Sequence, residues 1–525
     1  MCSQLYTTLD KSWRATARIV LGGDVGPLKD YEGWLAEYPP RPGKRASFLS
    51  GSEVTLAVDS YSPTARFISA DEAGSISTAP LSINEIKDLD SLAAALKERW
   101  AYCGNRVLGS SSSVESSDLV SDSTYVAKSS NIQQSSHIFS SFMARRGSRN
   151  AFGSGYFRRG EFTIRSFAGA DITRCLEAHF NADSSDLYFS HNCFGCSELM
   201  FSFFQRGKRH LIGNLQLPKE KYLSIKKKLL AEIREELIGE KRLPSLFELA
   251  GAPPAKRVLE LGLPGRQPEE SMERIERAFA STFRAIFRKE PEGMAKYESW
   301  LSRHSVAISE TDSPFGHKVS FPTHPELAVL SLMPAGRSVS LEESLHLGSL
   351  RLDEADLSSL GRLMEALPRI AYFTPEVREG RCANNIRSPL VYNASHTYKV
   401  YDATNSEYAG VASQVLDSKY IFGGNRVMES EFCINCHNTL NSARCFEADG
   451  VIRCSDSLFC HNSEGLQDCL FCLFCFNLKG KRHAIGNASL ETGRYAAIRN
   501  SLVDQLADEI LAKKSCKLDI FTIGG

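Results

Sequence analysis

Residues 406–417 read SEYAGVASQVLD, residues 418–429 read SKYIFGGNRVME, and residues 430–441 read SEFCINCHNTLN. Written one under another, these rows place small or slim side chains in every third column. The columns continue downstream as Ser406, Ser418, Ser430, Ser442, Cys454; Ala409, Ile421, Cys433, Cys445, Ser457, Cys469; Ala412, Gly424, Cys436, Ala448, Cys460, Cys472; and Val415, Val427, Thr439, Val451, Ser463, Cys475. The repeat predicts a flattened coil of twelve residues per turn whose successive turns stack as parallel strands about 4.8 Å apart. Every third side chain points inward, where a thiol serves as a small apolar group.

A looser form of the pattern occurs earlier in the chain. Branched residues recur every six positions at Val120, Val126, Ile132 and Ile138, with serines between them. The spacing predicts half a coil per repeat, and it predicts that the serine hydroxyls bond to turn backbone groups. The alternative for residues 109–141 is a disordered low-complexity segment.

Short stretches recur in the same order in the two halves of the chain. GKRHLIGN at 207–214 returns as GKRHAIGN at 480–487. Similar pairs are 12–18 with 282–288, 31–35 with 297–301, and 81–96 with 350–367. Collinear matches of this kind predict a tandem duplication with halves 1–265 and 266–525.

The predicted fold class is α+β. Each half is expected to contain a mixed α/β portion and a small parallel β-solenoid of twelve residues per turn, capped by an amphipathic helix. The first helix is predicted at 218–241 from a stripe of apolar residues at helical spacing. The expected segments are mixed α/β portions at 1–105 and 266–397, solenoids at 106–216 and 398–488 (the second cysteine-rich), a capping helix and linker at 217–265, and a capping helix and tail at 489–525.

Two resemblances follow from these motifs. The twelve-residue coil resembles that of small insect antifreeze proteins, but their outward Thr-x-Thr ladder is replaced here by pairs such as Tyr420 and Phe422, so ice binding is not implied. CLFCFNLKGKRHAIGN at 472–487, followed by LETGRY at 490–495, resembles the closing segment of an uncharacterised cysteine-repeat β-solenoid family with the motif CxxCxxLxxKxxxIxN. The N-terminal zinc ribbon of that family is missing. The resemblance implies a fold and no known activity.

The totals restrict the class of protein. Lys plus Arg and Asp plus Glu number 62 each, so the formal net charge is zero, which argues against a general nucleic-acid or anionic-membrane binder. No secretory signal is recognised at the N-terminus, and no apolar run approaches the ~18–20 residues of a membrane span. We therefore expect a cytoplasmic protein whose 15 cysteines are reduced.

Two cysteine groups have the spacing of metal ligands. Cys469, Cys472 and Cys475 follow the C-x2-C-x2-C spacing of iron–sulfur proteins, and Cys433 with Cys436 has the spacing of half a zinc site. A coil with an inward residue at every third place produces the same spacing without any metal. No cofactor is predicted, and iron–sulfur or zinc binding is the alternative.

The repeated basic segment is the candidate for a shared binding feature. Its cationic and titratable side chains could meet a phosphate or carboxylate, and the alternative is an exposed turn before each capping helix. The residues are Lys208, Arg209, His210, Lys481, Arg482 and His483. Common catalytic motifs are absent from the sequence, so no catalytic residue is predicted.

The sequence favours a non-enzymatic structural or interaction scaffold, a subunit of a larger protein assembly. Partners would dock on the solenoid faces, where Tyr408, Tyr420 and Phe432 are expected to face outward. One alternative is a metal- or iron–sulfur-binding protein that uses residues 469–475. Another is an enzyme with a site between the duplicated halves. No nucleic-acid or membrane partner is expected, and oligomers are possible.

Overall fold

The computed structural model describes residues 4–57, 60–75, 81, 82, 84–251, 271–437, 446, 447, 460, 470–476 and 482–525. The chain divides into two compact units, each assembled from three separate stretches. Unit 1 comprises residues 1–42, 107–265 and 310–377, and unit 2 comprises residues 43–106, 266–309 and 378–525. These units do not coincide with the contiguous halves 1–265 and 266–525 that a tandem duplication predicts. The boundaries of the six predicted segments stay a prediction.

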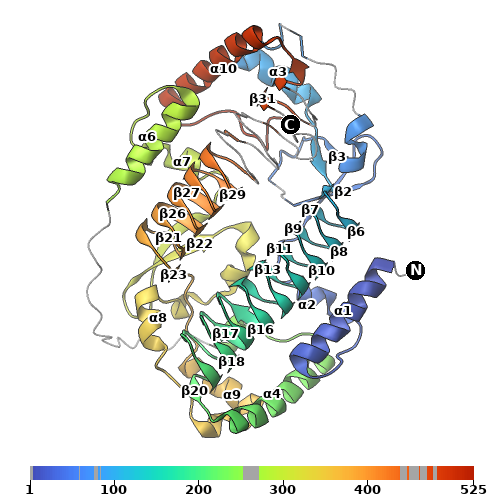
Figure 1. Ribbon diagram of the computed structural model, residues 1–525, viewed down its shortest axis with the longest axis vertical. Coiled ribbons are helices and arrows are strands. Elements are labelled where there is room, and N and C mark those ends of the chain that lie inside the picture. Colours follow the sequence, from blue (N-terminus) through green and yellow to red (C-terminus); the bar gives the residue numbers. More distant parts are fainter. Residues whose placement is uncertain are drawn as a thin grey trace. The chain divides into compact units, whose positions relative to one another are not determined.

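Unit 1 is built on one large sheet of sixteen strands, which we call the large sheet (Figure 1). Its strands are β5 (Val107–Leu108), β6 (Ser112–Glu115), β7 (Asp118–Ser121), β8 (Thr124–Ala127), β9 (Ser130–Gln133), β10 (Ser136–Phe139), β11 (Phe142–Arg145), β12 (Arg149–Phe152), β13 (Gly155–Arg158), β14 (Glu161–Ile164), β15 (Phe167–Ala170), β16 (Thr173–His179), β17 (Ser185–His191), β18 (Ser197–Met200), β19 (Arg209–Ile212) and β20 (Leu215–Gln216). Twelve of them follow the order β5-β7-β9-β11-β13-β15-β16-β14-β12-β10-β8-β6. The sheet therefore runs out along the odd strands and returns along the even strands, which makes it barrel-like and nearly closed.

The predicted fold class is wrong on this finding. Strands β5 to β19 join in a single large, nearly closed parallel sheet, to which β20 adds an antiparallel edge, rather than a small β-solenoid, and the architecture of the described chain is mixed α/β. The tandem arrangement is also corrected, because each unit takes one stretch from the other half of the chain. A sequence repeat sets only the spacing of neighbouring strands. It carries no information on how many strands join, or on which core the intervening segments cover.

The twelve-residue spacing occurs in the structure as the register of paired strands. Val120 pairs with Ile132 on β7 and β9, and Val126 pairs with Ile138 on β8 and β10, all parallel. The six-residue pattern thus alternates between two layers of the sheet. Since residues 109–141 contain strands β6 to β10, the low-complexity alternative is wrong.

The backbone of the large sheet turns in an unusual way. About every third residue has a positive φ, including bulky ones such as Leu119 (+56°), Tyr125 (+56°) and Phe162 (+56°). The left-handed region costs a non-glycine residue roughly 1–2 kcal/mol. Such a backbone persists only because each turn is held by hydrogen bonds to the turns on either side.

Serines supply part of this support. The Ser129 hydroxyl accepts the N–H of Ser141 at 3.0 Å and donates to the Ala127 carbonyl at 2.7 Å, and Ser123 bonds in the same way to Ser135 and Ser121. The predicted role of the serine hydroxyls is confirmed. Cysteine takes the same place further along, where the Cys196 sulfur accepts the N–H of Lys208 at 3.4 Å. The interior between the layers is filled by small or branched side chains.

Helices and a third stretch of chain complete unit 1. Helix α1 (Gln4–Leu21) packs across the even strands, and α4 (Lys219–Glu240) follows the last strand (Figure 1). The helix predicted at 218–241 is confirmed, with Tyr222, Leu229, Ile233 and Leu237 buried. The remaining elements of the unit are α2 (Glu32–Leu35), α5 (Leu246–Leu249), β22 (Lys318–Thr323), α8 (Leu341–Leu347) and α9 (Leu360–Ala366).

The stretch 310–377 binds the end of the large sheet directly. The Leu352 N–H donates to the Gly213 carbonyl at 2.9 Å, and the Asn214 side chain donates to the Leu350 carbonyl at 2.8 Å. Gly213 has φ +57°, and a Cβ there would lie 2.6 Å from Leu352. Because Gly213 has no side chain, Leu352 can approach its backbone closely, and this contact holds residues 310–377 against the end of the large sheet.

Unit 2 contains a smaller parallel sheet, which we call the second sheet, with strands β24 (Ala383–Ile386), β25 (Leu390–Tyr392), β26 (Ser395–Thr404), β27 (Glu407–Leu416), β28 (Lys419–Phe422), β29 (Asn425–Met428) and β30 (Glu431–Ile434). A three-stranded group follows, formed by β31 (Leu470–Leu473), β32 (Arg482–Ile485) and β33 (Ala488–Ser489). The other helices and strands of unit 2 include β1 (Gly43–Ala46), β2 (Glu53–Leu56), β3 (Phe67–Ser69), α3 (Leu89–Arg99), β4 (Tyr102–Gly104), α6 (Glu273–Phe287), α7 (Glu298–Leu301) and α10 (Thr492–Lys513). Strands β21 (Ala307–Asp312) and β23 (Val377–Glu379) cross the unit boundaries.

The core of unit 2 combines side chains from all three of its stretches. Trp100 packs on Phe476 with ring centroids 4.8 Å apart, and the Leu89 N–H donates to Gln505 of α10 at 3.1 Å. In the second sheet, Ala409 pairs with Ile421, and Ile421 pairs with Cys433. Cys445 and Cys469 of the same predicted column lie outside the described residues. Within the described part, every helix is too short or too polar to cross a bilayer.

Candidate functional site

The basic residues predicted from the sequence do not converge on one open site. Lys208 and Arg209 are exposed, whereas His210 turns back to the sheet and lies 2.7 Å from Glu198. The His210 ring also packs against Tyr222 of α4, with centroids 5.5 Å apart. These contacts give His210 a structural partner on each side.

The second basic segment has the same arrangement where the structure describes it, with an exposed arginine and a histidine packed between rings. Arg482 is exposed, and the His483 ring lies between Phe471 at 5.4 Å and Tyr495 of α10 at 5.3 Å. Lys481 lies outside the described residues. Anion binding by the exposed members Lys208, Arg209 and Arg482 stays a prediction.

All described cysteines except Cys382 are buried, and Cys382 packs against the core of the second sheet. Cys433, Cys436, Cys460, Cys472 and Cys475 are buried with alanines, valines and an isoleucine of the second sheet. The Cys475 sulfur lies 3.3 Å from the Leu473 carbonyl. Among the described residues, no group of three or more His, Cys, Asp or Glu side chains is placed to hold a metal ion. Cys469 lies outside them, so the expectation of no cofactor stays a prediction. This arrangement does not support the description of the solenoid predicted at 398–488 as cysteine-rich.

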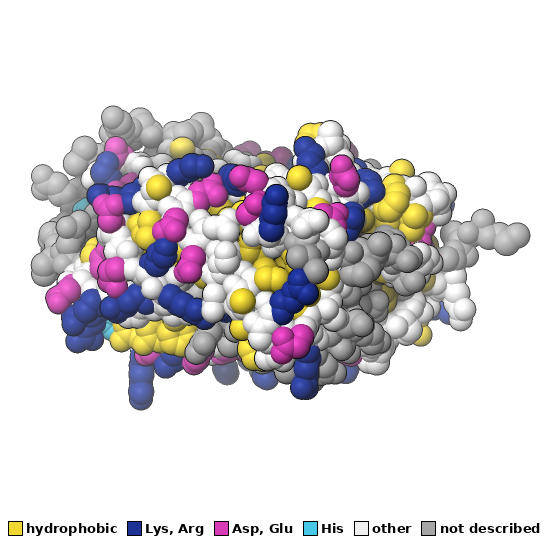
Figure 2. Space-filling model, turned by 90° about the horizontal axis from the view of Figure 1, so that it is seen from above, with side chains coloured by type: hydrophobic (Ala, Val, Ile, Leu, Met, Phe, Trp, Pro, Cys, Tyr) yellow, Lys and Arg dark blue, Asp and Glu magenta, His cyan; other side chains and the backbone are white. Residues whose placement is uncertain are grey.

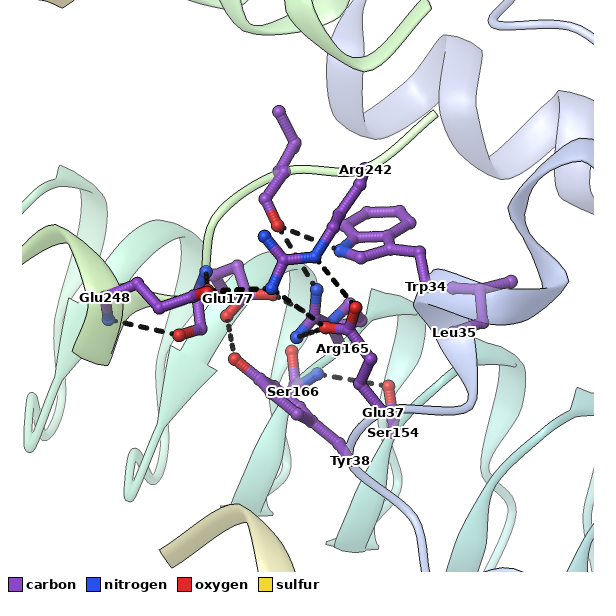
Figure 3. A network of polar contacts seen from close by, with 12 residues as sticks. Trp34, Leu35, Glu37, Tyr38, Ser154, Arg165, Ser166, Glu177, Arg242 and Glu248 are labelled. Atoms are coloured by element: carbon purple, nitrogen blue, oxygen red, sulfur yellow. Dashed lines mark hydrogen bonds and ion pairs between the residues drawn. The ribbon is translucent and has the colours of Figure 1, made fainter. Parts of the chain in front are cut away.

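A buried charge cluster in unit 1 surrounds Arg165, which follows β14 (Figure 3). Its side chain is fully buried, as is that of Glu177, twelve residues later on β16. Arg165 Nε lies 3.1 Å from Glu177 Oε1, and Arg165 Nη2 lies 2.9 Å from Glu37 Oε2. The guanidinium group lies 4.0 Å from the Tyr38 ring centroid and 5.0 Å from that of Trp34. Arg165 and Glu177, which are twelve residues apart, thus form a buried ion pair covered by the segment that follows α2.

Hydrogen bonds join this cluster to a second loop. The Tyr38 hydroxyl donates to Glu177 Oε2 at 2.5 Å, and the Trp34 indole donates to the Leu243 carbonyl at 3.1 Å. Arg242 binds Glu37 and Glu248, each at 2.8 Å (Figure 3). The buried charges are therefore compensated within the cluster, which fastens residues 34–38 and 242–248 to the large sheet.

The pKa shifts of Tyr38 and Arg165 agree with a protonated phenol beside a charged guanidinium group. Burial raises the pKa of Tyr38 well above its ordinary value, so its hydroxyl stays a donor. Burial by itself would lower the pKa of Arg165, but Glu177, Tyr38 and Glu37 outweigh it and raise that pKa. The side chains of Arg165 and Glu177 have zero exposure, so these two residues hold structure and are shielded from solvent.

Two buried histidines extend the cluster toward the stretch 310–377. The His179 ring packs against Tyr38 at 5.5 Å and Phe247 at 4.9 Å. The Thr374 N–H donates to His191 Nε2 at 3.0 Å, and burial lowers the pKa of His191 well below its ordinary value. A neutral His191 can accept the Thr374 N–H, and both histidine rings pack against neighbouring aromatic side chains.

Unit 2 contains a comparable cluster around Arg303. This side chain forms an ion pair with the buried Glu447 and donates to the Leu518 carbonyl at 3.0 Å. His304 lies 2.5 Å from Asp519. Burial would raise the pKa of Asp519, but the hydrogen bond and charge of His304, with Arg303, lower it to about 2. This cluster fastens the C-terminal segment to unit 2.

Sequence reasoning missed both clusters. The available signal was the pairing of opposite charges at the coil spacing, as in Arg165 and Glu177 or Arg174 and Asp186. The contributions of Glu37, Tyr38 and Arg242 could not be inferred, because they come from distant segments. No family model, curated protein or solved structure matches the chain. The resemblance to the cysteine-repeat family stays a prediction.

Proposed function

We propose that the chain is a non-enzymatic interaction protein of the cytoplasm, a subunit of a larger protein assembly. The observation that carries the proposal is a stack of half-buried aromatic rings on the second sheet, which we call the aromatic ladder. It consists of His396, Tyr408, Tyr420 and Phe432, the second residues of β26, β27, β28 and β30. Successive ring centroids are 4.9, 5.1 and 4.9 Å apart, at interplanar angles of 22°, 14° and 4°.

The geometry of the ladder favours a protein partner. Stacking covers the ring faces, so the rings present their edges outward, and a sugar or a base would find no free face within the stack. Tyr408 and Tyr420 rest partly on the core of unit 2, which holds them rigid. A preordered aromatic strip loses little side-chain entropy on binding.

Charged side chains border the ladder on the preceding strand positions. Lys419 lies 3.1 Å from Glu407, and Glu431 follows one coil later. Lys419 and Glu431 are exposed. An aromatic centre with a charged margin matches the composition of protein interfaces.

The test replaces the central ring. Tyr420→Lys places a charge in the strip, and we expect affinity for the partner to fall about 30-fold or more, as for an interface hot spot. The matched control is Tyr125→Lys, which changes a half-buried stacked ring of the large sheet, 4.9 Å from His137. Tagged wild type and variants are purified from cells that express the protein naturally, and bound proteins are quantified by mass spectrometry. The proposal fails if Tyr420→Lys retains every stoichiometric partner, or if both variants lose the same ones.

A further inference from the structure

One side of helix α6 carries four arginines, which we call the arginine stripe. Arg274, Arg277 and Arg284 lie on one face of the helix because they are three and seven residues apart, and Arg288 follows at its C-terminal end. All four side chains are exposed, whereas Phe279 on the opposite face is buried in the core of unit 2. The stripe therefore presents its charge to solvent over about 21 Å of helix.

Two members of the stripe have acidic neighbours. Arg277 lies 3.0 Å from Glu273, and Arg284 lies 3.3 Å from Glu290. Each of these four side chains is more than half exposed, so the two ion pairs contribute little to stability. A ligand can therefore take the place of either glutamate at small cost.

The two end members, Arg274 and Arg288, have no carboxylate partner among the residues that the structure describes. Arg274 Nη1 lies 3.2 Å from His396 Nε2 instead. Elsewhere on the described surface opposite charges pair, as Lys419 does with Glu407, and the face in Figure 2 shows Lys and Arg side chains among Asp and Glu side chains. Four arginines and two glutamates thus leave an excess of positive charge along the stripe.

Helix α1 of unit 1 provides an internal reference, because it packs in the same way. Trp13 of α1 packs on Tyr31 with ring centroids 5.1 Å apart, and Phe279 of α6 packs on Tyr297 at 5.6 Å. The same interval of 266 residues separates Trp13 from Phe279 and Tyr31 from Tyr297. Residues of the two helices can therefore be compared at this interval.

The compared face of α1 is less basic. It has Lys11 and Arg18 at two of the four places, because Thr8 and Gly22 occupy the other two. Arg18 is bound to Asp24 at 2.6 Å. The excess charge is thus particular to α6 and does not follow from the packing that the two helices share.

The stripe runs beside the aromatic ladder. Helix α6 packs on β26, β27, β28 and β30, the strands that carry the ladder. At the start of the helix, Arg274 contacts His396 of β26, the first ring of the ladder. At its end, Phe287 packs at 5.2 Å on Phe446, which pairs with the end of β30. A ligand bound along the stripe therefore lies next to the edges of the stacked rings.

The chemistry of the stripe and the ladder together limits the ligand. Guanidinium groups bind carboxylates through paired hydrogen bonds, and charges at helical spacing match carboxylates at the same spacing on a second helix. A nucleic acid could contact the arginines through its phosphates, but its bases would find no free ring face within the ladder, where rings stack at about 5 Å. These observations favour an acidic protein segment.

We infer that the arginine stripe binds an acidic helical segment of a partner protein. The inference rests on the proposed function, because it names the chemistry of the partner beside the aromatic ladder. The stripe and the ladder share no residue, so a purely acidic helix tests the stripe alone.

The test uses the full chain and the peptide acetyl-EAAEAAQEAAEAAQE-amide, whose glutamates share one helical face, with binding measured by calorimetry at two salt concentrations. We expect saturable binding that weakens with salt, and no binding of the same peptide with glutamine in place of every glutamate. The double variant Arg274→Gln, Arg288→Gln should weaken binding about tenfold, because it removes two exposed charge contacts. It should fold, since both sites are exposed and glutamine has nearly the helix propensity of arginine.

The matched control is Lys11→Gln, which removes an exposed cation at the place on α1 that corresponds to Arg277 and should leave the affinity unchanged. The inference is overturned if the glutamine peptide binds equally, or if Lys11→Gln weakens binding as much as the double variant does. Tighter binding of a ten-nucleotide single strand than of the acidic peptide would also overturn it.

Tyr420→Lys separates this inference from the proposed function. The variant should not weaken binding of the acidic peptide, because Tyr420 belongs to the ladder, and a loss of affinity would overturn the assignment to the stripe. If the peptide does not bind while Tyr420→Lys loses a natural partner, the inference fails and the proposed function stands. If the peptide binds the stripe while Tyr420→Lys keeps every partner, the proposed function fails and the stripe stands.

Discussion

Replacing Glu177 by alanine should release the segments that the Arg165 cluster fastens to the large sheet. The substitution removes a fully buried carboxylate that lies 3.1 Å from Arg165 and accepts the Tyr38 hydroxyl at 2.5 Å. Breaking a buried ion pair from one side costs about 3–5 kcal/mol, and an unsatisfied buried hydroxyl costs about 1–3 kcal/mol. The two terms overlap, and Glu37 still compensates part of the charge of Arg165. We therefore expect the free energy of local opening of the segments that the cluster holds to fall by about 4 kcal/mol.

Native-state hydrogen exchange measures this loss locally. Peptides covering 161–179 and 242–249 should exchange faster in Glu177→Ala, while peptides of unit 2 serve as an internal reference. Glu354→Ala is the matched control, because it breaks an ion pair with Lys221 in which the side chains are 62% and 42% exposed. That exposed pair should contribute less than about 1 kcal/mol. The double variant Arg165→Met, Glu177→Leu should regain most of the loss, since apolar side chains can replace a buried ion pair.

The reasoning is refuted if Glu177→Ala changes the opening free energy of 161–179 by no more than Glu354→Ala does. It is also refuted if the double variant is less stable than Glu177→Ala. Either result would mean that the charges at Arg165 do not hold the two segments in place.

Two further predictions concern unit 1. Burial raises the pKa of Glu376 from 4.5 to about 7 despite hydrogen bonds from the Ser320 and Leu341 N–H groups, so the neutral form favours folding. The stabilisation of unit 1 by neutral Glu376 should be complete below pH 4.5 and should be lost as the pH rises to about 7, by at most about 3 kcal/mol. In urea unfolding measured across this pH range, Glu376→Gln should flatten the dependence of stability on pH. An unchanged slope in the variant would contradict the prediction. In thermal unfolding, Gly213→Ala should destabilise unit 1 by at least about 1 kcal/mol more than Gly207→Ala. Both glycines have a positive φ, but only a Cβ at Gly213 would meet Leu352. Equal destabilisation by the two variants would contradict a role for the close approach of Leu352.

The sequence by itself determined the spacing of the strands. Slim side chains at every third position allow the layers to approach, and this is why residues twelve apart, such as Ile421 and Cys433, become partners. It also determined α4, whose apolar stripe from Tyr222 to Leu237 has helical spacing. These are local properties, and a local pattern is enough to predict them.

The tertiary structure alone decided the closure of the large sheet, the assignment of 43–106 and 310–377 to units, and the burial of Arg165. Closure depends on which strand ends meet, and no residue spacing encodes it. The interleaving depends on single close approaches, such as Leu352 at Gly213. The Arg165 cluster needs Glu37 and Arg242, which lie far apart in the chain and meet only when both fold onto the same coil. Long-range contacts of this kind leave no periodic trace in the sequence, because each is made once.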